Sequence, residues 1–102
     1  MRYPNSDMIS TYKGHTEGTH HSCEVLLRDD EIVVEYTDDN VRVTYHGHKT
    51  ADGHYAVQHD EDGCRYSGTL RRTEEDLLEG EWQTTLAGSI YSSGTWSIEL
   101  AS

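Results

Sequence analysis

The sequence predicts an all-β domain, an antiparallel up-and-down meander that forms a small barrel or a strongly curved sheet with little or no helix. Apolar and polar residues alternate with a period of two along most of the chain. Turn-forming segments recur at intervals of about 8–14 residues, and no window has helical periodicity over the length that a stable helix needs. The number of turns indicates about six to eight strands.

The first strands are predicted between His21 and Tyr45, with polar turns at residues 28–31 and 37–40. One side of these strands carries the apolar residues and is expected to face the core, while the other side is polar and meets water. The residues expected on the inner side are His21, Cys23, Val25, Leu27, Ile32, Val34, Tyr36, Val41, Val43 and Tyr45.

The second half of the chain repeats this pattern. Turns are predicted at residues 49–53, 60–63 and 87–88, and the polar segment 71–76 is expected to be a turn or one turn of helix. The residues expected on the inner side are Tyr55, Val57, His59, Cys64, Tyr66, Gly68, Leu70, Leu78, Gly80, Trp82, Thr84, Leu86, Ile90, Ser92, Gly94, Trp96, Ile98 and Leu100.

Glycines recur two residues after an apolar or aromatic residue within these strands, at Gly14, Gly47, Gly68 and Gly80. A glycine inside a strand weakens the strand unless a bend, a bulge or a close approach of backbone requires it. Repeated glycines at inward positions allow a sheet to coil and close, with Tyr or Trp from neighbouring strands covering the bare backbone. The glycines therefore predict strong curvature.

The chain is short enough to form one domain, which we place at residues 11–102. Residues 1–10 lack the alternating pattern and are expected to form a flexible N-terminal arm. Neither a signal peptide nor a membrane-spanning apolar stretch is recognisable, so the expected location is cytoplasmic. Cys23 and Cys64 are then expected as thiols, and a disulfide between them would require that their strands be neighbours.

The net charge of −11 argues against nucleic acid and against anionic membranes as partners. Binding to phosphates requires clustered Lys and Arg, and the largest cluster here is Arg71–Arg72. Acidic side chains such as Asp38–Asp39 fall in predicted turns, where they solvate and cap the backbone. The segment Asp60-Glu61-Asp62-Gly63 is similar to part of a calcium loop but lacks the later ligands.

The strands Leu78-Glu79-Gly80-Glu81-Trp82 and Ser93-Gly94-Thr95-Trp96 resemble the Gly-x-Trp strands of the avidin and lipocalin groups. The resemblance implies a small meander barrel. Lipocalins carry Gly-x-Trp on their first strand and add a helix, and avidins carry such a strand near the N-terminus. Because the motif lies late in this chain, neither biotin nor lipid, and no binding residue, is transferred by correspondence.

Histidines suggest two metal arrangements, neither of which becomes a predicted site. His46 and His48 point to the same side of a strand, but this is the polar side that faces water. His21 and Cys23 share the inner side and would hold zinc only if His59 or Cys64 joined them. The spacing matches no standard zinc module, so no metal or other cofactor is predicted.

No catalytic residue is predicted either. Ser92-Ser93-Gly94 lacks the Gly-x-Ser-x-Gly pattern and the strand-turn-helix context of a nucleophile elbow. Cys23 with His21 would imitate a Cys–His dyad, but side chains two residues apart on one strand point in parallel. The protein is therefore not expected to be an enzyme.

The aromatic side chains carry the functional prediction. The chain has seven Tyr, two Trp and no Phe, so its rings bring hydroxyl and indole N–H groups that need partners. Tyr45, Tyr66, Trp82 and Trp96 are expected on the inner side, where they would either fill the core or line a cavity for a small, partly apolar ligand. The prediction is a non-catalytic binding module; the alternative is an interaction domain that uses an edge strand or the outer face, with a homodimer as its simplest form.

Overall fold

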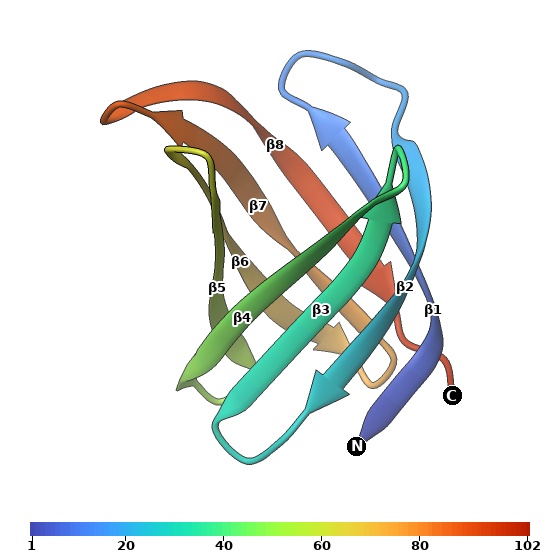
Figure 1. Cartoon of the computed structure of the whole chain (residues 1–102). Helices are drawn as coiled ribbons and strands as arrows, with labels where there is room; N and C mark the ends of the chain where they lie inside the picture. Colours follow the sequence, from blue (N-terminus) through green and yellow to red (C-terminus); the bar gives the residue numbers. More distant parts are fainter.

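Eight antiparallel strands make up most of the protein, and the computed structural model describes all residues 1–102. In chain order they are β1 (Arg2–Tyr12), β2 (Thr19–Leu27), β3 (Glu31–Asp38), β4 (Val41–Ala51), β5 (His54–Glu61), β6 (Cys64–Glu74), β7 (Leu77–Leu86) and β8 (Ser89–Glu99). Each strand pairs with the next, and β8 pairs with β1, so the sheet closes into a barrel (Figure 1). The predicted all-β meander barrel is confirmed. No helix with the length and hydrophobicity of a membrane span is present.

The predicted turns are confirmed, although the strands extend further into them than expected. Short hairpins turn at Asp39–Asn40, Asp62–Gly63 and Ala87–Gly88, where backbone φ is positive at every residue. The polar segment 71–76 is a continuation of β6 and a tight turn, without a helical turn. Asp and Asn tolerate the left-handed conformation better than most residues, and Gly adopts it without steric cost, which is why these segments reverse the chain.

The two ends of the barrel differ in what closes them. The upper end in Figure 1 carries the β1–β2 loop and the β3–β4, β5–β6 and β7–β8 hairpins, while the lower end carries the other three hairpins and both chain termini. At the lower end the amide of Leu100 donates a hydrogen bond to the carbonyl oxygen of Asp76. The side chain of Leu100 is buried and plugs this end.

The predicted N-terminal arm is wrong, because residues 2–12 form strand β1. This strand pairs with β2 along most of its length and with β8 from Asp7 to Tyr12, so it closes the barrel. A bulge between Tyr3 and Ser6 shifts the register and buries Ser6 among apolar side chains. The bulge interrupts the period of two at residues 3–6, and beyond it Ser6 and Ser10 take inner positions while Ile9 is exposed, so an apolar pattern does not reveal the strand.

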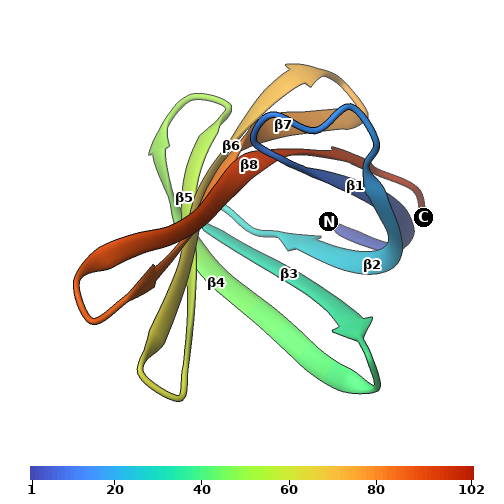
Figure 2. The ribbon, with the colours of Figure 1, turned by 90° about the horizontal axis from the view of Figure 1, so that it is seen from above.

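Glycines allow the strong twist visible from above in Figure 2, as predicted for Gly47, Gly68 and Gly80. A Cβ atom built on Gly80 would lie 1.8 Å from the carbonyl oxygen of Thr69, and one on Gly94 would lie 1.9 Å from that of Thr11. These strands approach each other more closely than any side chain permits. Gly14 is the exception, since it lies in the β1–β2 loop with open space around it.

Aliphatic and ring-bearing side chains are unevenly distributed along the barrel interior. The lower half holds most of the buried aliphatic side chains together with Tyr3 and Tyr55, and the upper half holds most of the ring-bearing side chains together with Val43. The buried aliphatic set consists of Met8, Val25, Leu27, Ile32, Val34, Val57, Leu70, Leu78, Ile98 and Leu100. Val41, Leu86 and Ile90 were expected to face inward but are at least 45% exposed, because they lie next to the upper turns, beyond the packed interior.

Candidate functional site

Every strand contributes one aromatic or imidazole side chain to the inner side of the upper half. We call these eight residues the upper ring cluster. Its members, in strand order from β1 to β8, are Tyr12, His21, Tyr36, Tyr45, His59, Tyr66, Trp82 and Trp96. The period of two explains why each side chain points inward. The rings on β1, β2, β3, β5 and β6 lie close to the upper turns, while Tyr45, Trp82 and Trp96 lie deeper and meet them from below.

The four aromatic residues predicted from the sequence all belong to this cluster, but they lie at different depths. Tyr45 and Trp96 are each 4% exposed and pack edge to face with ring centroids 5.1 Å apart. Tyr66 and Trp82 are only partly buried. A ligand that approaches from the upper end would therefore meet Tyr66 and Trp82 first, with Tyr45 and Trp96 as the floor.

The two tryptophans are anchored by their indole N–H groups. Trp96 Nε1 donates to the carbonyl oxygen of Thr69 at 2.9 Å, and Trp82 Nε1 donates to that of Thr95 at 3.0 Å. Each indole also covers a glycine, since a Cβ atom on Gly68 would contact the ring of Trp96 and one on Gly94 that of Trp82. The tryptophans thus hold the curved wall together, and their ring faces are fixed in place.

Backbone pairing stops below the upper end at three seams between strands. Pairing of β2 with β3 ends at Cys23 and Tyr36, pairing of β4 with β5 ends at His46, and pairing of β8 with β1 ends at Tyr12. Above these points the hairpins diverge, as Figures 1 and 2 show. The barrel wall at the upper end is therefore open between strands in a way that the lower end is not.

Rings of the upper ring cluster lie across two of the seams, β2–β3 and β4–β5, and a third ring contact covers the paired β1–β8–β7 strands. His21 and Tyr36 have ring centroids 5.0 Å apart across the β2–β3 seam, and Tyr45 and His59 are 6.1 Å apart across the β4–β5 seam. Tyr12 meets Trp82 edge to face at 5.1 Å, over the glycine of β8 that separates them. Side-chain contacts are easier to open than a backbone ladder, so the seams are natural points of entry.

Two histidines at these seams face a carboxylate on their outer side. His21 Nε2 lies 3.5 Å from Asp38 Oδ1, and His59 Nε2 lies 3.4 Å from Glu61 Oε2. On its other side, His21 Nδ1 is buried and has no hydrogen-bond partner. A buried polar atom without a partner is uncommon in folded proteins and marks a place where a bound molecule can supply one.

Burial raises the phenol pKa of three tyrosines in the cluster. It raises the pKa of Tyr36, Tyr45 and Tyr66 above the ordinary value for tyrosine. Nearby carboxylates act in the same direction, Asp38 on Tyr36 and both Glu61 and Asp62 on Tyr66. The upper end therefore presents neutral hydroxyl groups, which both donate and accept hydrogen bonds, within reach of negative charge.

The cysteine and histidine arrangements considered from the sequence are not assembled. Cys23 and Cys64 are both free, and their strands β2 and β6 are not neighbours. Burial, assisted by Asp7, raises the pKa of the Cys23 thiol to about 12, so this residue is a poor nucleophile. His46 and His48 lie exposed on the outer side of β4, and no group of three or more His, Cys, Asp or Glu side chains could hold a metal ion.

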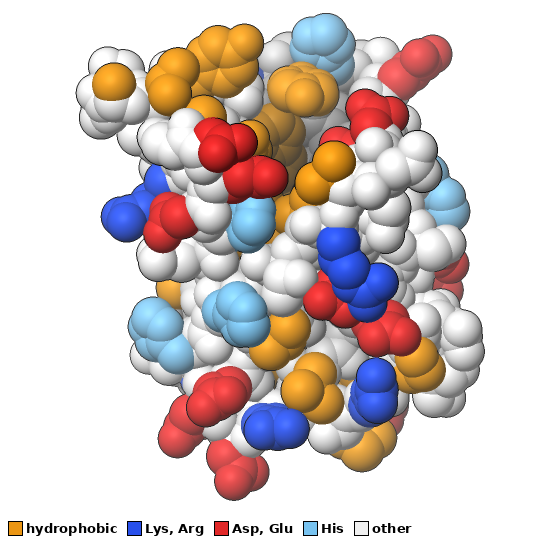
Figure 3. Space-filling model, in the orientation of Figure 1, with side chains coloured by type: hydrophobic (Ala, Val, Ile, Leu, Met, Phe, Trp, Pro, Cys, Tyr) orange, Lys and Arg blue, Asp and Glu red, His pale blue; other side chains and the backbone are white.

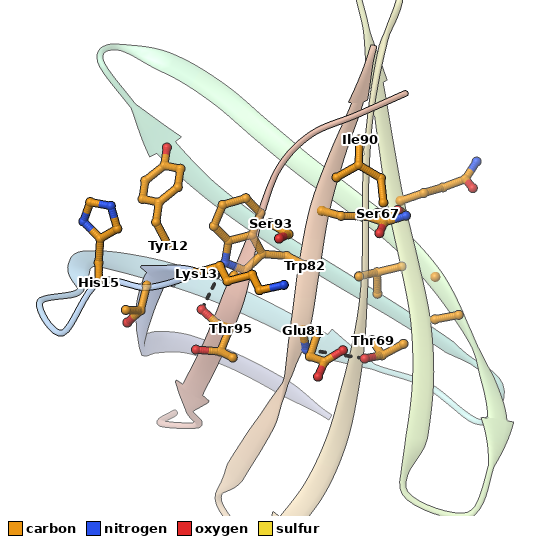
Figure 4. A pocket seen from close by; sticks show the side chains of 18 of the residues that line it. Tyr12, Lys13, His15, Ser67, Thr69, Glu81, Trp82, Ile90, Ser93 and Thr95 are labelled. Atoms are coloured by element: carbon orange, nitrogen blue, oxygen red, sulfur yellow. Dashed lines mark hydrogen bonds between the residues drawn. The ribbon is translucent and has the colours of Figure 1, made fainter. Parts of the chain in front are cut away.

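A large depression runs along outward-facing side chains of β4 to β8, is lined as well by Tyr12 and Trp82 of the upper ring cluster, and was not predicted. It has a volume of about 1180 Å³, and a neighbouring depression of about 730 Å³ shares several of its residues. Figure 4 shows Trp82 between Tyr12 and Glu81, with Thr69 and Thr95 close to the carboxylate. Because only 5 of the 21 lining residues are hydrophobic, this groove lacks the apolar lining typical of small-molecule sites.

Sequence reasoning missed half of the upper ring cluster as a set. Tyr36, His21 and His59 were placed on the inner side but were read with the aliphatic residues of their strands, and Tyr12 was not assigned to the inner side. The available signal was positional, since the ring on each of β1, β2, β3, β5 and β6 lies within three residues of an upper turn.

No protein-family model, curated protein or solved structure matches this chain.

Proposed function

We propose that this protein is a non-catalytic binding module that holds a small, partly apolar ligand at the upper end of the barrel. The observation that carries the proposal is the gathering of rings with hydroxyl, indole and imidazole groups in the upper half of the interior, above a core in which aliphatic side chains predominate. The lower half supplies the stability of the barrel. The upper half combines apolar ring faces with a few polar groups, which is the composition of ligand sites.

The size of the barrel favours a small ligand. An eight-stranded barrel is just wide enough to be filled by side chains or to hold one small molecule. Here the lower half is filled, and the ring surface that remains partly exposed belongs to Tyr36, Tyr66 and Trp82, with Tyr12 at the rim. A monocyclic compound that stacks on one ring and hydrogen-bonds to a hydroxyl or to His21 Nδ1 fits this arrangement.

Titrations with benzyl alcohol and benzyltrimethylammonium, monitored by tryptophan fluorescence, test the proposal. We expect at least one probe to bind with a dissociation constant of about 1 mM or tighter. Both Tyr66→Leu and Trp82→Leu should weaken this binding by about tenfold or more, because each removes a ring face worth roughly 1 kcal/mol beyond its buried area.

Tyr3→Leu is the matched control, since Tyr3 is also a partly buried tyrosine but packs at the lower end. Its thermal unfolding should change as much as that of Tyr66→Leu while its affinity for the probe stays at the wild-type value. If neither probe binds, or if Tyr3→Leu and Tyr66→Leu weaken binding equally, the upper end is not the site.

An exposed apolar patch on the β7–β8 hairpin favours a second function, self-association. Leu86, Ile90 and Tyr91 are 45%, 66% and 76% exposed and lie together around the turn at Ala87–Gly88. Clusters of exposed apolar side chains on one hairpin are typical of interaction surfaces. The closed barrel offers no full edge strand, so of the two interaction surfaces expected from the sequence only a surface contact fits.

Native mass spectrometry of the wild type and of an Ile90→Ser, Tyr91→Ser double variant tests this second function. A homodimer through the hairpin predicts dimeric wild-type protein and a monomeric variant with unchanged thermal stability, since neither side chain is part of the core. A monomeric wild type at micromolar concentration would exclude this self-association.

A further inference from the structure

The upper end is acidic as well as aromatic. Carboxylates project from the β3–β4 hairpin at Asp38 and Asp39 and from the β5–β6 hairpin at Glu61 and Asp62. Figure 3 shows hydrophobic atoms set back near the top of the molecule with acidic side chains on both sides of them. The apolar interior is therefore reached between two negatively charged hairpins, β3–β4 and β5–β6, which flank the β4–β5 seam. We call their carboxylate-bearing ends, Asp38–Asp39 and Glu61–Asp62, the acidic lips.

The basic residues near this entrance are already paired or face elsewhere. Arg42 forms an ion pair with Glu35, and Arg65 Nε lies 2.9 Å from Asp60 Oδ1, both on the outer side of the barrel. Lys13 lines the outer groove. Of the carboxylates on the two lips, Asp38 and Glu61 contact His21 and His59, none has an Arg or Lys partner, and the protein as a whole carries a charge of −11. Such a field concentrates cations at the entrance.

The rings behind the entrance present the surface that a cation prefers. An aromatic ring has a negative face and a positive edge, so an ammonium group is attracted to the face of Tyr or Trp. Tyr36 lies 5.0 Å from the ring of His21, which contacts Asp38, and Tyr66 lies 5.7 Å from the ring of His59, which contacts Glu61. Ring faces and negative charge thus act on the same volume.

We infer that the ligand of the upper end is a small organic cation, a substituted ammonium compound whose charged group lies between Tyr36, Tyr66 and the acidic lips. This inference rests on the proposed function and adds the chemical class of the ligand. An ammonium group with alkyl substituents fits better than an inorganic cation, because the rings replace water around its apolar surface and no cluster of metal ligands is present.

Isothermal titrations with choline and with 3,3-dimethylbutan-1-ol, its uncharged isostere, test this inference. The two compounds have the same shape and differ only in the charge of the quaternary centre. We expect choline to bind about tenfold or more tightly than the isostere, with an affinity that falls as NaCl is raised. Equal or tighter binding of the isostere would overturn the inference while leaving the proposed function in place.

Variants identify where the charge preference arises. A Glu61→Gln, Asp38→Asn double variant should reduce choline affinity several-fold and leave the affinity for the isostere unchanged. Glu99→Gln is the matched control, because Glu99 ends β8 at the lower end. A double variant that binds choline as tightly as the wild type would contradict the assigned position, and failure of choline to bind would contradict the inference itself. The proposed function itself would be contradicted by a different result, namely that neither benzyl alcohol nor benzyltrimethylammonium binds.

Discussion

Replacing Gly80 by alanine is expected to remove a large part of the free energy of unfolding of this protein. The added Cβ would lie 1.8 Å from the carbonyl oxygen of Thr69 and 2.6 Å from its carbonyl carbon. Both atoms belong to the backbone of the adjacent strand β6, so no side chain can move aside. Relief would require β6 and β7 to separate where the barrel bends, with a cost of at least about 3 kcal/mol. A small domain has only about 5–15 kcal/mol of stability in total.

Gly88→Ala is the control for this prediction. Gly88 lies in the β7–β8 turn with φ of 84° and no other atom within 4 Å of a built Cβ. Alanine there meets only the cost of the left-handed backbone conformation, about 1–2 kcal/mol. Urea unfolding followed by circular dichroism compares the two. If Gly80→Ala unfolds at the same urea concentration as Gly88→Ala, the close approach of β6 and β7 is not what curves the sheet.

Replacing Leu78 by alanine is expected to cost about 3–4 kcal/mol, typical of a fully buried leucine in a packed core. Leu78 has no exposed surface and pairs across β7–β8 with Ile98, which is equally buried. The side chains around Leu78 are closely packed, so they cannot move into the cavity that the truncation leaves. The free energy of unfolding should therefore fall by much of the total for a barrel of this size.

Leu86→Ala provides the comparison within the same strand. Leu86 is 45% exposed at the upper end of β7, so its truncation should change the free energy of unfolding by less than about 1 kcal/mol. The folded fraction of Leu78→Ala should retain wild-type affinity for a probe bound at the upper end. A Leu78→Ala variant that is as stable as Leu86→Ala would contradict the division of the interior into a stabilising half and a binding half.

The meander was predictable because it depends on local pattern. Alternation places Ile32 and Val34 on the inner side whatever the rest of the chain does, and turns such as Asp62–Gly63 reverse the backbone through their own φ preferences. Closure was not predictable in the same way. Closure depends on the pairing of β8 with β1, two segments at opposite ends of the chain. In addition, β1 contains a bulge between Tyr3 and Ser6, so its start does not follow a period of two.

Half of the members of the upper ring cluster were predicted as a set, and their arrangement was not. Alternation correctly turned Tyr45, Tyr66, Trp82 and Trp96 inward, but it contains no information on depth. Whether a ring lies deep in the interior or near its opening depends on how far neighbouring strands are offset along the barrel. The same offset decides where backbone pairing ends and the seams begin. The pairing of His21 with Asp38 follows from the same stagger, since these residues lie on adjacent strands beyond the last paired residues.

Intermolecular nuclear Overhauser effects between benzyltrimethylammonium and the protein test most directly whether ligands bind inside the upper end. We predict contacts from the methyl protons of the probe to the ring protons of Tyr36 and Tyr66. Contacts confined to the methyl groups of Ala56, Thr69 and Thr95 would place the probe in the outer groove and contradict binding at the upper ring cluster.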